Sequence, residues 1–201
     1  MTVEIVHLQP KHFRVAIELQ RLAFPPPFDE NLLWREENLA DHLCKFPEGQ
    51  FVALADGQFA GSCSNTRISK AHYEKHLSWV ETVGGFSFET FDPCGEVIYG
   101  ADISVHPSFR RVGIGRAFYD ARKALAQSLG VLYATACRLP DFQSSGVATP
   151  AEYCKLVADG RLTDRTLTPL LRYDLILTDV LQNYMDDPES GNAAALLEWR
   201  P

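Results

Sequence analysis

The sequence predicts an α/β domain in which a mixed, mostly antiparallel sheet is flanked by helices. Three observations lead to this prediction. Short strand-like runs recur along the whole chain, helical patterns lie between some of them, and the order is not a regular strand–helix–strand alternation. The chain has 201 residues, of which 46% are hydrophobic and 22% charged. A chain of this length can bury about 70% of its unfolded surface, so we expect one domain over residues 1–201.

The N-terminal elements follow from local patterns. Residues 3–8 alternate between apolar and polar side chains and predict a first strand. Residues 10–24 have apolar side chains at helical spacing, and the run Pro25-Pro26-Pro27 ends that helix as a stiff turn. Residues 32–46 predict a second helix.

A hairpin and an ambiguous segment follow. Asp56-Gly57 lies between the strand-like runs 51–55 and 58–64, which favours a type I′ turn. Residues 70–95 predict a loop with one short strand or helix. The aromatic residues of that segment are expected either to pack in the core or to line a pocket; they are Trp79, Phe86 and Phe91.

The C-terminal half has the clearest signals. Val97–Val105 predicts a central strand that ends at His106-Pro107. Residues 116–129 predict a helix capped by Gly130, with one apolar face formed by Ile114, Ala117, Phe118, Ala121, Leu125 and Leu129. The remaining expected elements are a strand at 131–137, a helix from Thr149-Pro150 to about Asp159, and strands at 175–181 and 193–199.

The segment Arg110-Arg111-Val112-Gly113-Ile114-Gly115-Arg116-Ala117 is the strongest functional signal. It joins the central strand to the following helix. Glycines at such a junction let the backbone approach a ligand closely, and the first turn of a helix offers unpaired N–H groups. Together they predict a phosphate-binding loop, to which the three arginines add positive charge.

The glycine spacing separates this loop from two common alternatives. A dinucleotide fingerprint needs a third glycine where the chain has Phe118, and a Walker A loop needs a Gly-Lys-Ser/Thr that the chain lacks. The remaining pattern, Arg-x-x-Gly-x-Gly at the start of a helix, resembles the acetyl-CoA pyrophosphate loop of the GCN5-related N-acetyltransferase (GNAT) superfamily. The order of the elements is also similar to the GNAT fold.

A narrower resemblance appears outside the loop. The runs at residues 99–107, 149–153 and 183–190 resemble an acetyltransferase module that precedes a nitrilase-like domain in some bacterial proteins. The chain ends at Pro201, where such a module would end, so no hydrolase domain is expected here.

The GNAT resemblance implies a function and a set of cofactor-binding residues. It implies an N-acetyltransferase in which an amine directly attacks the thioester of acetyl-CoA, the co-substrate. The main chain of Ile103, Ser104 and Val105 would pair with the pantetheine arm, and one N–H there would stabilise the oxyanion. The pyrophosphate would lie against the loop, bound by Arg110, Arg111, Val112, Gly113, Ile114, Gly115, Arg116 and Ala117.

The catalytic groups are less clear, because the chain departs from the family pattern. The usual asparagine after the fifth strand and the usual tyrosine before Gly-Phe have no clear counterparts. Asp102, within the apolar central strand, is the leading candidate base, and Glu96 is a second. Tyr184 and Tyr99 are candidate acids; Tyr99 also occupies the position of the glutamate base of the histone-acetylating branch. Each of these residues could instead be structural.

Composition narrows the partners. The net charge of −7 argues against nucleic acid, and no apolar run is long enough for a membrane span. The five cysteines are odd in number and have no metal-binding spacing, which favours a reduced, cytoplasmic setting without a metal site. The GNAT resemblance implies a small-molecule or peptide amine as acceptor and allows a homodimer. The alternative is a CoA-binding regulatory module with weak or no catalysis.

Overall fold

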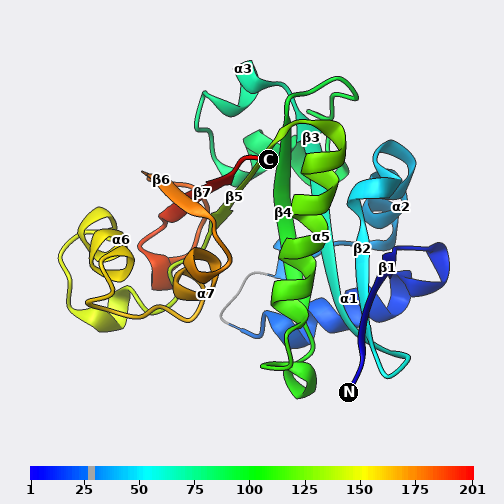
Figure 1. The fold of residues 1–201 in the computed structure, drawn as a ribbon, viewed down its shortest axis with the longest axis horizontal. Coiled ribbons are helices and arrows are strands. Elements are labelled where there is room, and N and C mark those ends of the chain that lie inside the picture. The colour runs from blue at the N-terminus through cyan, green and yellow to red at the C-terminus, as the bar shows by residue number, and fades with distance from the viewer. Residues whose placement is uncertain (27–29) are drawn as a thin grey trace.

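The computed structural model describes residues 1–26 and 30–201, and within them it contains a seven-stranded sheet (Figure 1). The strand order is β1-β2-β3-β4-β5-β7-β6, and every neighbouring pair is antiparallel except β4 and β5, which run parallel. The predicted mixed, mostly antiparallel sheet is thereby confirmed. The strands are β1 (Val3–His7), β2 (Phe51–Ala55), β3 (Gln58–Ile68), β4 (Val97–Val105), β5 (Leu132–Cys137), β6 (Ile176–Leu181) and β7 (Ala194–Trp199).

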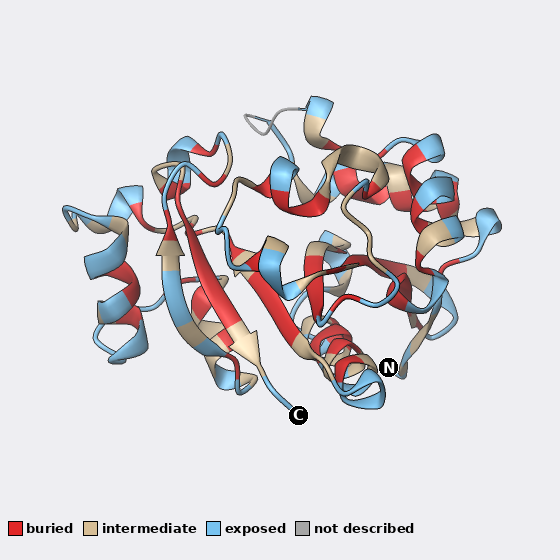
Figure 2. Cartoon of the chain, turned by 90° about the horizontal axis from the view of Figure 1, so that it is seen from above, coloured by how far each residue is buried: buried red, intermediate tan, exposed pale blue. Residues whose placement is uncertain are grey.

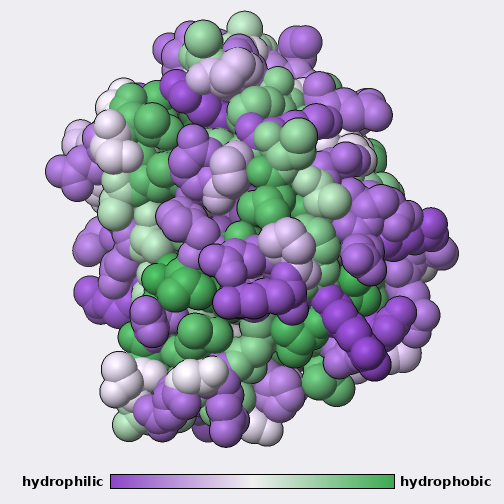
Figure 3. Space-filling model, turned by 90° about the vertical axis from the view of Figure 1, so that its right-hand side faces the viewer, coloured by the Kyte–Doolittle hydropathy of each residue, from purple (hydrophilic) through white to green (hydrophobic). Residues whose placement is uncertain are grey.

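Helices cover both faces of this sheet. The α-helices are α1 (Phe13–Ala23), α2 (Glu36–Lys45), α3 (Lys70–Tyr73), α4 (Trp79–Val83), α5 (Ile114–Leu129), α6 (Pro150–Ala158) and α7 (Leu167–Arg172). Figure 1 shows α5 lying along β4, with α6 and α7 grouped beside β6 and β7. Figure 2 shows the buried residues concentrated in the strands and on the inner sides of the helices. Figure 3 shows hydrophobic side chains scattered among hydrophilic ones on one outer face.

Three hydrophobic clusters hold the layers together. One joins α1, α4 and the segment around Trp34 to the sheet, through residues such as Phe13, Trp79 and Tyr99. A second packs α5, α6 and α7 against β5 and β7, and a third packs α5 against β2 and β3. The helices on the two sides of β4 thus pack mainly in different clusters, with α1 in the first and α5 in the second and third.

Most predicted elements are confirmed within one or two residues at their ends. Asp56 and Gly57 have φ angles of 47° and 79°, as a type I′ hairpin turn requires. The Thr149 side chain caps α6 by accepting from Glu152 N at 3.2 Å. Gly130 ends α5 in the left-handed conformation, with φ 65°. Of the predicted proline turn, Pro27 lies outside the described residues.

Several predictions are wrong in detail. Residues 70–95 contain two short helices, α3 and α4, and no strand. The helix predicted from residue 32 begins at Glu36, and α7 was not predicted. Leu129, assigned to the apolar face of α5, is 40% exposed, whereas the charged Arg122 is 1% exposed. Helical periodicity cannot predict the burial of Arg122, because its charged side chain is stabilised there by hydrogen-bond acceptors on the strands β3 and β4.

Two irregularities shape the middle of β4. Asp102 pairs with Ser64 and Gly100 with Asn65, so Ala101 is an extra residue on β4 and forms a bulge. The pairing of β4 with β5 covers only Val97 to Gly100. Beyond that point β4 continues beside β3, while β5 pairs with β7. The two parallel strands therefore separate from Ala101 onward and leave an opening in the sheet.

Candidate active site

The loop before α5 presents unpaired main-chain donors in open space. The first helical hydrogen bond runs from Ala117 N to the Gly113 carbonyl at 2.9 Å, so the preceding amides lie before the hydrogen-bonded part of the helix. Gly113 has φ 93°, and a Cβ placed on it or on Gly115 would meet no atom within 4 Å. The backbone at both glycines is thus accessible to a ligand.

The side chains around this loop are mostly turned to solvent. Arg110, Arg111 and Arg116 are exposed, and Arg116 lies 3.7 Å from Asp120 in a surface ion pair. Val112 is exposed, whereas the side chain of Ile114 is buried against β2 and β3. A diphosphate at this loop would therefore accept hydrogen bonds from main-chain N–H groups, and the arginine side chains nearby would add positive charge.

The opening between β4 and β5 supplies further main-chain groups. His106 N donates to the Ala60 carbonyl at 2.9 Å, on the β3 side. Alternation along an extended strand then directs the polar groups of Ile103 and Val105 away from β3, toward the opening. The same alternation turns those of Ser104 toward β3. The main-chain groups of Ile103 and Val105 are thus directed to where a pantetheine arm could pair with them, as the prediction requires. Those of Ser104 are not, so this part of the prediction is wrong.

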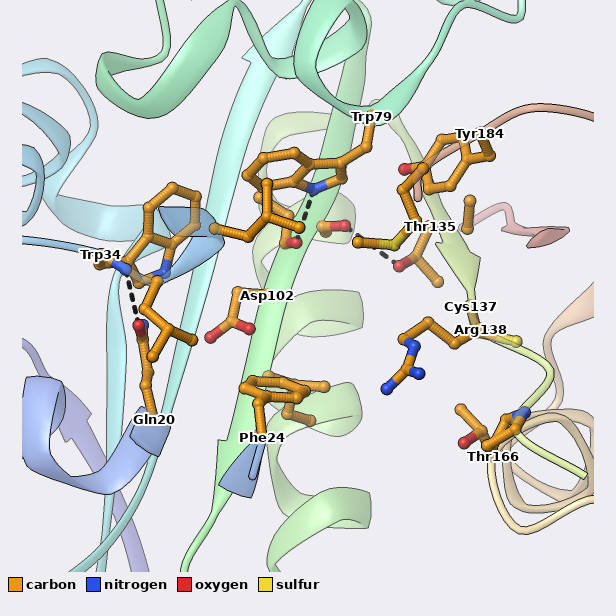
Figure 4. Close-up of a pocket in the computed structure, with 18 of the residues that line it drawn as sticks. Gln20, Phe24, Trp34, Trp79, Asp102, Thr135, Cys137, Arg138, Thr166 and Tyr184 are labelled. Carbon is orange, nitrogen blue, oxygen red and sulfur yellow. Dashed lines mark hydrogen bonds between the residues drawn. The ribbon is translucent and has the colours of Figure 1, made fainter. Parts of the chain in front are cut away.

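A cavity of about 260 Å³ lies at this opening (Figure 4). Its walls come from the end of α1, residues 32–34, α4, the middle of β4, the middle of α5, the end of β5 with the residues that follow it, Thr166, and the segment after β6. The side chains labelled in Figure 4 are Gln20, Phe24, Trp34, Trp79, Asp102, Thr135, Cys137, Arg138, Thr166 and Tyr184. The cavity therefore combines aromatic walls with a few polar groups.

Asp102 is the one carboxylate among the described residues that line this cavity. Burial raises its pKa to about 6, although Arg122, the Ser104 hydroxyl, Ile103 N and the Trp34 indole each act to lower it. Ser104 Oγ donates to Asp102 Oδ2 at 3.2 Å. The result is a carboxylate, ionised at neutral pH, whose proton affinity is higher than usual.

Tyr184 and Tyr99 form a buried pair at the edge of the cavity. Their hydroxyl oxygens are 2.7 Å apart, and Tyr184 lines the cavity. Burial raises the pKa of both, while the hydrogen bond with Tyr99 lowers that of Tyr184. Either hydroxyl can be the donor in this hydrogen bond.

Other predicted residues lie away from this centre. Glu96 is exposed at the start of β4, where it accepts from Lys70 N at 2.9 Å; this contact is the largest cause of its lowered pKa. His106 accepts from Ser108 N in the turn after β4. Cys137 does line the cavity, but burial raises the pKa of its thiol. Of the aromatic candidates, Trp79 lines the cavity, and Phe86 packs behind it with ring centroids 5.9 Å apart.

Sequence reasoning missed several cavity residues. Trp34 lies in a segment predicted as helix, and Gln20 lies on the buried side of α1. Arg138 forms a bidentate pair with Asp187, with both N–O distances 2.6 Å. Arg122 donates to the Asp102 carbonyl at 2.6 Å from the α5 side. No local pattern signals these roles, because each depends on contacts between distant segments.

Residues 1–26 and 30–201 contain neither a metal-binding cluster nor a membrane-spanning helix. No three His, Cys, Asp or Glu side chains there come together as ligands for a metal ion. None of the helices in those ranges combines the length and apolar character needed to cross a bilayer.

An open main-chain loop at a helix N-terminus, beside a split parallel strand pair and a cavity, is the arrangement that the resemblance to acyl-CoA-dependent acyltransferases implied. A family model described as the acetyltransferase (GNAT) family matches residues 13–148. The chain belongs to this family, as its loop and element order predicted.

Similar proteins agree with this assignment. The chain is 34% identical to the uncharacterized N-acetyltransferase YkwB of Bacillus subtilis, over 92% of this chain and 82% of YkwB. It is 32% identical to the probable hydrolase YhcX of the same organism, over 97% of this chain but only 38% of YhcX.

Solved structures share the fold at low identity. The loading GNATL domain of CurA from Lyngbya majuscula superposes with a TM-score of 0.83 at 19% identity, covering 100% of this chain and 98% of that domain. The GphF GNAT-like decarboxylase in complex with isobutyryl-CoA gives 0.76 at 17% identity, covering 98% of each chain. At these identities the likeness concerns the fold alone.

Proposed function

We propose that this chain is an N-acetyltransferase that moves the acetyl group of acetyl-CoA to an amine by direct attack. The observation that carries the proposal is the opening of β4 from β5 at Ala101. The cavity that holds Asp102 lies at this opening, and the loop before α5 follows the C-terminal end of β4. We treat residues 1–201 as one catalytic unit that works in the cytoplasm.

The main chain would hold the co-substrate. The amides of residues 112–116 would donate to the pyrophosphate, each charged hydrogen bond contributing about 1.5–3 kcal/mol. The Ala117 amide, which the sequence prediction included, already donates to the Gly113 carbonyl and is not available. Arg110, Arg111 and Arg116 would add charge without fixed geometry, because they are exposed. Ile103 and Val105 would pair with the pantetheine arm as an added strand, and an amide there would stabilise the oxyanion.

Asp102 is the proposed general base. An alkylammonium group has a pKa near that of lysine, about 10, so the acceptor must lose a proton before it attacks. Asp102 faces the cavity and has a pKa of about 6, closer to neutral than an ordinary aspartate. Glu96 is a poor base by comparison, because it is exposed and lies at the far end of β4.

Tyr184 is the proposed acid that protonates the leaving thiolate. Its raised pKa keeps the hydroxyl protonated, and the Tyr99 hydroxyl at 2.7 Å orients it. Tyr99 is accordingly a positioning residue. A tyrosine in the segment after β6 would replace the one that the family usually carries before Gly-Phe.

A CoA-binding module with little catalysis is the second candidate. It is favoured by the missing family tyrosine and by the burial of Tyr184, which is 3% exposed. Relatives also show variety in the acyl group and acceptor: GphF was solved with isobutyryl-CoA, and Arabidopsis thaliana Naa50 with a CoA-peptide bisubstrate analogue. The narrower likeness to modules that precede nitrilase-like domains stays a prediction, as does a homodimer.

The test is acceptor-dependent thiol release. The protein is incubated with acetyl-CoA and a panel of primary amines, amino acids and peptides, and free CoA is measured. Release that requires an acceptor supports the enzyme. Tight CoA binding without release under any condition supports the module. Parallel reactions with isobutyryl-CoA and malonyl-CoA establish whether the acetyl group is preferred.

A further inference from the structure

Aromatic side chains surround the Asp102 carboxylate in the cavity. Figure 4 shows Phe24, Trp34 and Trp79 around it, each from a different segment of the chain. The faces of aromatic rings attract both apolar rings and cations, and indole does so most strongly. The walls therefore suit a ligand that carries both features.

The two indoles are held in fixed positions. Their ring centroids are 5.5 Å apart. The Trp34 main-chain N–H donates to Gln20 Oε1 at 2.7 Å, and Trp79 Nε1 donates to the Ala101 carbonyl at 3.0 Å. Behind Trp34, His42 makes an edge contact at 4.7 Å, and burial lowers the pKa of His42 to about 4, so it stays neutral. The aromatic wall is preorganised rather than formed on binding.

Three charged residues line the cavity among those that the structure describes: the carboxylate of Asp102 and the guanidinium groups of Arg122 and Arg138. Arg138 is neutralised by Asp187 at 2.6 Å and Glu189 at 3.2 Å. Arg122 reaches the opening from the α5 side and donates to the Asp102 carbonyl. The Trp34 indole N–H is buried without a hydrogen bond and lies close enough to Asp102 to act on its carboxylate.

We propose that this cavity accepts an arylalkylamine, a primary ammonium group joined by a short alkyl chain to an aromatic ring. The ammonium group would bind Asp102, and the ring would pack against Trp34, Trp79 and Phe24. This inference rests on the proposed function, because the bound amine is the acceptor for acetyl transfer. The short alkyl chain lets the nitrogen reach the opening between β4 and β5 while the ring stays among the indoles.

The test measures binding separately from transfer. The protein is saturated with CoA, which cannot react, and affinities are measured by equilibrium dialysis for 2-phenylethylamine, 2-phenylethanol, propylamine and putrescine. We expect 2-phenylethylamine to bind about tenfold tighter than each of the others, because only it offers both ring and charge. Equal or tighter binding of the alcohol, of propylamine or of putrescine would overturn the proposal.

Variants of the cavity test separately whether the aromatic wall selects the ring and whether Asp102 selects the ammonium group. Trp34→Leu should remove the preference for 2-phenylethylamine over propylamine, whereas Phe86→Leu, which changes a ring behind the wall, should retain it. Phe24→Leu, at a half-exposed position, serves if Trp34→Leu does not fold. Asp102→Asn should remove the preference for amine over alcohol but keep the preference for the ring. Failure of the proposed function is distinguishable, since it would leave these affinities intact while no acceptor releases thiol from acetyl-CoA.

Discussion

The loop before α5 and the cavity beside Asp102 are adjacent, yet they are built from the chain in opposite ways. The loop is one continuous segment whose ligand-facing groups are main-chain amides. The cavity is assembled from side chains of α1, α4, β4, β5 and the segment after β6. A site made from backbone tolerates changes in side chains, whereas a site made from distant side chains changes with each of them.

The largest expected effect is on the backbone-built loop. Gly113→Glu places a carboxylate where an anion would bind, at a φ of 93° that favours glycine. We expect the CoA affinity to fall by about a thousandfold, since about three charged hydrogen bonds are lost. Isothermal titration calorimetry with CoA measures this. Gly57→Glu is the matched control, because Gly57 also has a positive φ and open space but lies in the β2–β3 hairpin. Unchanged CoA affinity in Gly113→Glu would contradict the loop assignment.

The next largest effect concerns the proposed general base in the cavity, Asp102. Asp102→Asn should lower kcat/KM by about a hundredfold, as expected for loss of a general base. Asp102 can accept a proton only when it is ionised. The kcat/KM of the parent should therefore rise with pH around 6, the pKa of Asp102, and the variant should show no such rise. CoA affinity should be unchanged. A variant with the parent rate and pH profile would show that Asp102 is structural, and Glu96→Gln is the control expected to behave like the parent.

The tyrosine pair should have a smaller effect. Tyr184→Phe removes the proposed acid and should reduce kcat about tenfold, with little change in KM. Tyr99→Phe keeps the acid but removes its hydrogen-bond partner, so its effect on kcat should be smaller. If Tyr99→Phe reduces kcat more than Tyr184→Phe, the roles assigned to the two hydroxyls are wrong.

The smallest effect is on stability. Folding raises the pKa of Asp102 from 3.8 to about 6, so the folded state binds more protons and loses stability as pH rises between these values. Asp102→Asn should therefore raise the free energy of unfolding by about 1–2 kcal/mol at pH 7.5, with less gain at pH 4. Urea unfolding at both pH values measures it. A loss of stability at pH 7.5 would mean that the ionised carboxylate stabilises the fold.

The contrast between the two regions also explains what the sequence could predict. The glycine loop, the hairpin at Asp56-Gly57 and the cap at Thr149 depend on neighbouring residues, so local patterns predict them. The short α7 was missed because it has only six residues and contains Pro169. The segment 70–95 was ambiguous because its helices are only four and five residues long.

The cavity was predictable only in part. Asp102 stood out as a carboxylate in an apolar strand. Its neighbours Trp34 and Phe24 did not, because their approach to β4 depends on how α1 and residues 32–34 pack over the sheet. Arg122, on α5, is likewise buried because it donates to the carbonyls of Ser64 on β3 and Asp102 on β4, which are distant in sequence.

The extra residue at Ala101 decides which face of the sheet receives Asp102. Gly100 lies opposite Asn65 and Asp102 lies opposite Ser64, and because those two β3 residues are consecutive, Gly100 and Asp102 face opposite sides of the sheet. In a regular strand, residues two positions apart share a face, so Asp102 would lie on the same side as Gly100, where a Cβ would meet Arg122. One inserted residue thus assigns the carboxylate to the opposite layer, where Trp34 lies.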